Sequence, residues 1–235
     1  MRDRLKRYAR LLTKWTCNAL AILSVGFLLG AGWLLALLLF ANLAHASDVT
    51  IPRAAQQYRA TLTRAAHATW GMDAPVSVLA AQIHTESGWN NEARSPVGAQ
   101  GLAQFMPSTA AWLPEVAPET GKPAPFNPGW SLRALCIYDR WLWERNDGAS
   151  DYERMAFTLS AYNGGQGWVN RDRKLARQRG LDAARWFGAV ATVNAGRSTA
   201  AWKENRNYPR RILEERQHAY VKAGWGPGIE DGARP

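Results

Sequence analysis

The sequence predicts a mainly α-helical domain preceded by one long apolar helix. The first observation is a stretch without Asp, Glu, Lys or Arg, which covers residues 15–46 of the 235-residue chain. The second is the spacing of apolar residues beyond it, which recur every three or four positions and do not alternate. The third is that Gly, Pro and helix-capping residues separate these periodic segments, as they do between helices.

The apolar stretch is long enough to cross a bilayer as a helix. Its core, residues 19–41, has 23 positions interrupted by a single polar residue, Ser24. Six Lys or Arg residues and one acidic residue precede it, and such a basic flank stays in the cytoplasm, so the rest of the chain is expected outside. Ala44-His45-Ala46 resembles a signal cleavage site, although the stretch exceeds an ordinary signal core. Residues 1–46 therefore fit an inner-membrane anchor facing the periplasm, and equally a signal that leaves a periplasmic protein after cleavage or release.

Charge and cysteine usage exclude several classes of protein. About half of the net charge of +10 comes from the first fourteen residues, which leaves too small an excess for a dedicated nucleic-acid binder. Export would also place the chain away from nucleic acid. Cys17 and Cys136 are expected to form no internal disulfide, and neither belongs to a metal-binding pattern. We therefore expect no nucleic-acid partner, no metal and no cofactor.

After residue 46 the predicted elements follow in a simple order. A connecting helical segment, residues 47–73, leads into a domain at 74–222, and residues 223–235 form a C-terminal tail. Helical spacing predicts three core-facing stripes within the domain. They comprise Val76, Leu79, Ala80 and Ile83; Leu132, Leu135, Cys136, Asp139 and Leu142; and Met155, Ala156 and Leu159.

Helix boundaries are marked by short local signals. Asp73 and Pro75 are expected to open the first domain helix. Ser150-x-x-Glu153 is a capping-box pattern, which predicts the start of a later helix. Gly164-Gly165 would end that helix. The domain is therefore expected to be built from helices joined by loops.

Glu86 is the residue on which the functional prediction depends. It follows the stripe of the first domain helix, so its carboxyl arrives at the helix end on the side turned toward the core. Burial disfavours the charged form of a carboxyl and raises its pKa, which keeps it protonated as a general acid. By helix position alone, the favoured interpretation is a Glu that bends out to solvent or pairs with an Arg.

The residues around Glu86 favour the catalytic interpretation. The run ESGWNNEARSPVGAQGLAQFMPSTA, residues 86–110, resembles the signature of the soluble lytic transglycosylase family. That resemblance implies a lysozyme-like helical fold, related to goose-type lysozyme, over about residues 74–213. Further matching elements follow in the family's order: Tyr138, then Ala161-Tyr162-Asn163-x-Gly165, then Glu204-x-Arg206-x-Tyr208. The departures are Asn91, Ala103, Ser131 and Leu135, of which Ala103 and Leu135 leave the shape of the sugar subsites open.

The resemblance also implies an activity and a set of site residues. The family cuts peptidoglycan glycan strands between N-acetylmuramic acid (MurNAc) and N-acetylglucosamine (GlcNAc) and leaves a 1,6-anhydroMurNAc end. Glu86 would be the catalytic acid and base, and the Tyr162 hydroxyl would lie near it. Substrate-binding residues implied by the resemblance are Ser95, Gln104, Tyr138, Tyr162, Asn163, Glu204 and Tyr208. Glu204 could equally form a structural salt bridge.

Alternatives stay open at the level of sequence. A hydrolytic muramidase would use the same architecture with water in place of the sugar hydroxyl, and a non-catalytic wall-binding module would not need Glu86. The biological role could be that of a phage endolysin, of a wall-opening enzyme for secretion or conjugation, or of housekeeping remodelling. A basic cluster is predicted to be a solvated helix face: Arg171, Arg173, Lys174, Arg177 and Arg179.

Overall fold

A computed structural model describes residues 49–232. The predicted membrane or signal segment, residues 1–46, lies outside the described residues. Within 49–232 the chain is helical, and its only β-type pairings are two isolated bridges in one loop. No helix in this part of the chain has the length and apolar character needed to span a membrane. The expectation of a mainly α-helical domain is confirmed.

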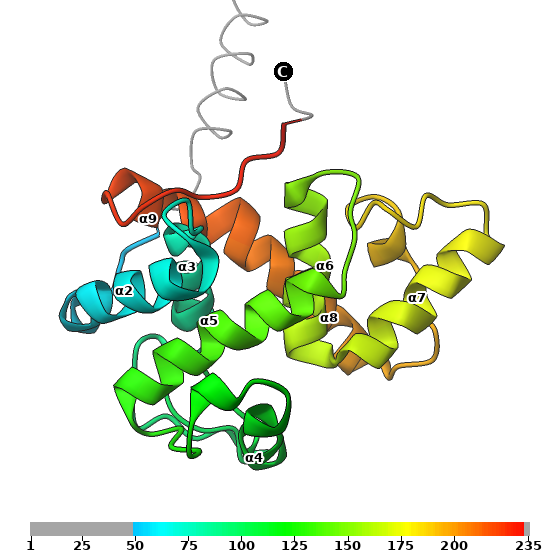
Figure 1. Ribbon diagram of the computed structural model, residues 1–235. Coiled ribbons are helices and arrows are strands. Elements are labelled where there is room, and N and C mark those ends of the chain that lie inside the picture. The colour runs from blue at the N-terminus through cyan, green and yellow to red at the C-terminus, as the bar shows by residue number, and fades with distance from the viewer. Residues whose placement is uncertain (1–48, 233–235) are drawn as a thin grey trace, which may run out of the picture. The chain divides into compact units, whose positions relative to one another are not determined.

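The first half of the domain is built around α3. A short helix, η1 (Arg53–Tyr58), leads into α2 (Arg59–Trp70), which packs against both α3 (Val76–Ser87) and α5 (Pro128–Glu144). Trp70 at the end of α2 donates its indole N–H to the Cys136 carbonyl of α5, at 3.0 Å. The predicted connecting segment thus contains a helix that belongs to the packed core (Figure 1).

The predicted core stripes are confirmed. Every residue of the three stripes is at most 1% exposed. The first stripe belongs to α3, the second to α5 and the third to α6 (Asp151–Gly164). In Figure 1, α5 and α6 cross the middle of the domain, with α2, α3 and α9 on one side and α7 on the other. Asp139 is buried with the apolar members of its stripe.

The helix-boundary signals are partly confirmed. Pro75 is the N-cap of α3, but Asp73 supplies no side-chain cap. Ser150 caps α6 by accepting the Glu153 N–H, and Gly165 is the C-cap. The capping box is wrong in its second half, because the Glu153 carboxylate does not return to Ser150. It accepts the N–H groups of Trp186 and Phe187, at 2.6 and 3.1 Å, and so supplies a partner for buried backbone of a distant loop.

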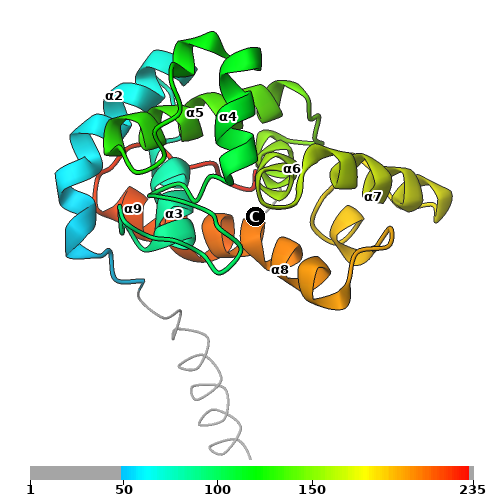
Figure 2. The ribbon, with the colours of Figure 1, turned by 90° about the horizontal axis from the view of Figure 1, so that it is seen from below.

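The remaining helices lie between α3 and α5 and after α6 in the sequence. Helix α4 (Pro107–Val116) and the short η2 (Pro118–Thr120) precede α5, while α7 (Gln166–Gln178) and η3 (Val190–Thr192) follow α6. A long final helix packs along α6 and then along α3 (Figure 2). It consists of α8 (Thr199–Arg210), a π-helical segment η4 (Arg211–Arg216) and α9 (Gln217–Lys222).

The C-terminal segment and the basic helix α7 depart from a simple surface role. Trp225, within the predicted tail, is 3% exposed and packs against Trp89. On α7, Arg171 is exposed as expected, but Arg173 is buried, donates to the Asp147 carbonyl and lies over the Phe157 ring. The prediction of a solvated face is therefore wrong for Arg173, because the Phe157 ring and the Asp147 carbonyl bind its guanidinium inside the domain.

Candidate active site

A cleft of about 540 Å³ opens where the end of α3, the loop after it, α5, α6 and α8 meet. All eight residues singled out from the sequence line this cleft, although they come from five separate segments. The acid and base candidate is Glu86, and the others are Ser95, Gln104, Tyr138, Tyr162, Asn163, Glu204 and Tyr208. The structure thus brings together side chains separated by up to 122 positions, the interval between Glu86 and Tyr208.

Glu86 occupies the last turn of α3 and receives a hydrogen bond from Tyr208. The Tyr208 hydroxyl donates to Oε1 at 2.5 Å. Burial raises the pKa of Glu86 to about 8, the Tyr208 hydrogen bond acts in the opposite direction, and the charge of Glu204 adds to the rise. At neutral pH Glu86 is then mainly protonated. The carboxyl can therefore give up a proton, as a general acid must.

Aromatic rings line the cleft beside Glu86. The rings of Tyr162 and Tyr208 stack with an interplanar angle of 4° and centroids 6.5 Å apart. Tyr138 and Phe105 pack against Tyr162 with centroids at 5.4 and 5.9 Å. The Tyr162 hydroxyl donates to the Ala103 carbonyl at 2.7 Å, so Tyr208, and not Tyr162, hydrogen-bonds the acid. Burial raises the pKa of both Tyr162 and Tyr208, which keeps their hydroxyls neutral as donors.

The loop after α3 presents Ser95 and Gln104 to the cleft. Ser95 Oγ accepts the Ala99 N–H at 2.9 Å, which fixes its rotamer and leaves its own O–H to donate to a ligand. The Gln104 amide nitrogen donates to the carbonyls of Ala93 and Gly101, at 3.1 and 2.9 Å, so its oxygen is turned to accept. Gln104 itself has φ +49°, a backbone conformation uncommon for residues other than glycine. The loop thus positions one donor and one acceptor.

Gly101 allows this loop to lie close to the segment before α5. A side-chain carbon at Gly101 would come within 1.9 Å of the Pro125 carbonyl oxygen, and its φ is +73°. Ser131, one of the departures from the family pattern, accepts the Ala103 N–H at 3.1 Å and ties the loop to α5. Ala103 and Leu135, the departures that left subsite shape open, are both fully buried and do not line the cleft.

Asn163 of α6 and Glu204 of α8 also line the cleft. The Asn163 side-chain oxygen accepts from the Asn205 amide at 3.0 Å, which fixes its orientation. Glu204 is exposed and forms no ion pair with any residue of 49–232. Within the described residues, Glu204 therefore does not form the structural salt bridge that was the alternative. Its carboxylate instead adds negative potential near Glu86.

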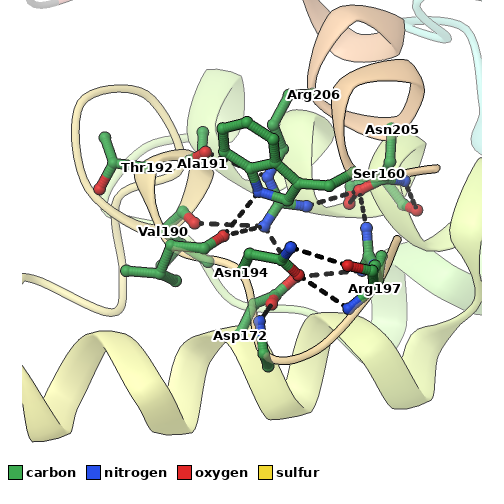
Figure 3. Close-up of polar contacts among 12 residues, drawn as sticks. Ser160, Asp172, Val190, Ala191, Thr192, Asn194, Arg197, Asn205 and Arg206 are labelled. Carbon is green, nitrogen blue, oxygen red and sulfur yellow. Dashed lines mark hydrogen bonds and ion pairs between the residues drawn. The ribbon is translucent and has the colours of Figure 1, made fainter. Parts of the chain in front are cut away.

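A buried polar network next to Asn163 is centred on Asp172, Arg197, Asn205 and Arg206 (Figure 3). Asp172 of α7 pairs with Arg197 and Arg206, at 3.0 and 2.8 Å, and its carboxylate is fully buried. Arg206 also donates to the Val193 carbonyl at 2.7 Å, and Arg197 donates to Asn205. Because Asn205 in turn holds Asn163, the network links α7 and α8 to a side chain of the cleft. Arg206 of the C-terminal motif is thus a support and does not line the cleft.

Sequence reasoning missed several residues that also line the cleft. They are Thr85, Val97, Ala99, Phe105, Met106, Thr109, Asn207 and Arg211. Asn207 and Arg211 could have been found from helical spacing, since they share a face with Glu204 and Tyr208. Phe105, Val97 and Met106 lie in an irregular loop, where no periodicity indicates direction. Within 49–232, no group of three His, Cys, Asp or Glu residues could hold a metal ion.

Comparison with known proteins identifies the family. The model described as the transglycosylase SLT domain matches residues 63–184, which is more than half of the chain. The chain belongs to this family. The matched residues include Glu86, the loop after α3, Tyr138 and the Tyr162-Asn163 pair, while Glu204 and Tyr208 lie beyond them.

Relatives with similar sequences agree with this assignment. The membrane-bound lytic murein transglycosylase F of Shewanella frigidimarina is 34% identical over 129 residues, which are 54% of this chain and 26% of that protein. The protein of the same name from Pasteurella multocida is 29% identical over 65% of this chain and 27% of its own length. The chain therefore spans about a quarter of the length of these relatives.

The fold of the SLT-domain chain is that of soluble lytic transglycosylases. The 70 kDa soluble lytic transglycosylase of Escherichia coli matches with a TM-score of 0.52 and 22% identity, over 72% of this chain and 25% of that one. A complex of a 70-kDa soluble lytic transglycosylase with bulgecin A has a TM-score of 0.54 and 23% identity, over 77% of this chain and 26% of that one. The implied fold is thereby confirmed.

Proposed function

We propose that this SLT-domain protein is a peptidoglycan lytic transglycosylase that cleaves the β-1,4 bond between MurNAc and GlcNAc and leaves a 1,6-anhydroMurNAc end. The observation that carries the proposal is the state of Glu86, a carboxyl with a pKa of about 8 that lines a cleft together with tyrosine rings and polar side chains. A group titrating near neutral pH can serve both as acid and, once ionised, as base. The family assignment and the names of the relatives support the substrate class.

The reaction begins with proton transfer from Glu86 to the glycosidic oxygen. The bond from that oxygen to C1 of MurNAc breaks, and the GlcNAc-terminated fragment leaves with the proton as its 4-hydroxyl. Positive charge at C1 is stabilised by the acetamido group of the same MurNAc, so a second protein carboxylate is not required for this step. The Tyr208 hydroxyl stays hydrogen-bonded to the Glu86 carboxylate that forms.

The second step closes the anhydro ring. The C6 hydroxyl of the MurNAc attacks C1, and the Glu86 carboxylate takes the proton of that hydroxyl. Glu86 is thereby returned to its protonated state and no water is consumed. Ser95 and Gln104 offer a donor and an acceptor to the acetamido and hydroxyl groups around this centre, and Asn163 offers its amide. Tyr138 supplies a ring face and a hydroxyl.

Glu204 provides the sharpest control, since it is the other carboxylate lining the cleft. We expect Glu86→Gln to lower cleavage of purified sacculi by more than a hundredfold, because general acid catalysis typically contributes 10²- to 10⁴-fold. Glu204→Gln should keep most of the activity and move its alkaline limit to lower pH, because the charge of Glu204 raises the pKa of Glu86. Equal inactivation by both substitutions would instead indicate a two-carboxylate glycosidase and contradict the proposal.

The products distinguish transglycosylation from hydrolysis. Mass spectrometry of muropeptides from digested sacculi should show 1,6-anhydroMurNAc ends as the main product, with activity unchanged by a chelator. Reducing MurNAc ends would place the protein with the hydrolytic muramidases. No cleavage by the wild type would leave a wall-binding module. Loss of activity with the chelator would contradict the metal-free, cofactor-free site that we propose.

We further propose that residues 1–46 hold the protein in the inner membrane, with the SLT domain in the periplasm. The names of the relatives, which include "membrane-bound", support association with the envelope. Gly26 and Gly30 reduce the apolar surface of the stretch, which suits an anchor that can release uncut protein, as a phage endolysin would. Cell fractionation with N-terminal sequencing tests this. A periplasmic species that begins at Ser47 and no full-length membrane form would show a plain signal peptide, and full-length protein in the cytosol would overturn export.

A further inference from the structure

A buried acid and amide lie directly behind the cleft. Asp139 of α5 and Gln82 of α3 are both 0% exposed, and Gln82 Nε2 donates to Asp139 Oδ1 at 3.3 Å. The other two polar atoms of the pair, Gln82 Oε1 and Asp139 Oδ2, have no hydrogen-bond partner among the described residues. Both are acceptors while Asp139 is ionised. Two buried acceptors without donors are rare in folded proteins and each costs free energy.

The surroundings of Asp139 offer no compensating charge. The titratable groups around it are Glu86 on α3, Cys136 and Tyr138 on its own helix, Tyr162 on α6 and Tyr208 on α8. None of them carries a positive charge, and within 49–232 no Lys, Arg or His forms an ion pair with Asp139. An isolated buried carboxylate of this kind takes up a proton in preference to staying charged.

We propose that Asp139 is a neutral carboxylic acid whose Oδ2 hydroxyl donates to Gln82 Oε1, so that the two side chains form a closed pair with two hydrogen bonds. A single proton then satisfies both unpartnered atoms at once. The direction of the electrostatics agrees, because burial raises the pKa of Asp139 well above its ordinary value. The pair ties α3 to α5 without placing a charge between them.

The location of the pair links it to Glu86. Gln82 precedes Glu86 by one helical turn, so the two side chains lie on the same face of α3. A charged Asp139 would add to the negative potential on Glu86 and hold its proton more tightly. In the neutral form Asp139 is a positioning residue that leaves Glu86 free to ionise after the first proton transfer. This last step rests on the function proposed above, whereas the protonation state of Asp139 does not.

Asp139→Asn is the discriminating substitution, because Asn reproduces both hydrogen bonds of a neutral acid. In the folded wild type, Asp139 should keep a proton that it releases in the unfolded chain above a pH of about 4. Because the pKa of Asp139 is higher in the folded protein than in the unfolded chain, Asp139 contributes its full stabilisation below a pH of about 4. This stabilisation is lost as pH rises toward the folded pKa. The unfolding constant of the wild type relative to Asp139→Asn should therefore grow about tenfold for each pH unit above 4, until the folded pKa is reached.

The measurement is urea unfolding of the full-length protein in mild detergent at several pH values between about 4 and 7. Glu144→Gln, which makes the same chemical change on the exposed face of α5, is the matched control. A wild-type to Asp139→Asn difference that stays constant with pH would overturn the proposal, because it would mean that Asp139 is ionised in the folded protein. Contributions from Glu86 are common to both proteins and cancel.

Infrared spectroscopy provides a second test that needs no variant. In wild-type protein made with carboxyl-labelled aspartate, one protonated-carboxyl band should persist at pH 7, and Glu86 does not contribute to it. Absence of that band would refute the neutral acid. For the link to function, the alkaline limit of cleavage should be the same in Asp139→Asn as in the wild type. A shift of the limit to lower pH in Asp139→Asn would mean that the substitution had removed a negative charge, and would contradict the neutral acid. A lack of cleavage by the wild type would count against the proposed function and leave the protonation state of Asp139 unaffected.

Discussion

Replacing Tyr208 with Phe should move the alkaline limit of glycan cleavage upward. The change removes one hydroxyl that donates to Glu86 Oε1 and keeps the ring that stacks on Tyr162. A hydrogen bond to a charged group contributes about 1.5–3 kcal/mol, which corresponds to about one to two pKa units. This bond stabilises the carboxylate form of Glu86, so its loss raises the pKa from about 8 toward about 9 to 10.

The pH dependence of cleavage carries this prediction, because activity is lost as Glu86 gives up the proton that it must donate. Initial rates of muropeptide release from sacculi should be measured between about pH 5 and 10. Tyr162→Phe is the matched control, since it removes a neighbouring hydroxyl that binds the Ala103 carbonyl and not Glu86. An unchanged or lowered alkaline limit in Tyr208→Phe, or an equal shift in Tyr162→Phe, would refute the role assigned to Tyr208.

Two further substitutions test the supports of the site. Asp172→Asn should destabilise the fold by about 3–5 kcal/mol in urea unfolding, because it leaves two buried arginines without their shared carboxylate; a loss below about 1 kcal/mol would show that the network is not needed for stability. Gly101→Ala should cost about 1–3 kcal/mol and lower cleavage, since its methyl group would meet the Pro125 carbonyl. Gly98→Ala has a similar φ of +93° with nothing within 4 Å, so a loss there as large as at Gly101 would contradict the packing argument.

Much of the fold could be predicted because helical periodicity reports burial directly. The stripe that ends in Ile83 indicated both the buried face of α3 and the side on which Glu86 emerges, and all eight candidate residues do line one cleft. The segments that contribute them are joined by loops whose course depends on tertiary contacts. Resemblance to a family supplied the grouping that periodicity alone could not.

The incorrect predictions share one cause: a side chain that fits a local sequence pattern binds a partner far away in the sequence instead. Ser150 and Glu153 have capping-box spacing, but the buried N–H groups of Trp186 and Phe187 take the Glu153 carboxylate. Arg173 belongs to a run of basic residues, but the space above the Phe157 ring accepts its guanidinium. A sequence shows what each side chain can bind, and only the fold decides which partner comes within reach.

The end of α3 is a suitable place for a carboxyl that must both give and take a proton. The negative end of the helix dipole and the desolvation of its carboxyl favour the neutral form of Glu86. Tyr208 favours the charged form through its hydrogen bond, and it comes from α8, which packs along η4 and α6 and is independently fixed by the Asp172 network. The two opposing influences therefore originate in different elements. A small displacement of α8 relative to α3 would weaken or strengthen the Tyr208–Glu86 hydrogen bond and so change the proton affinity of Glu86.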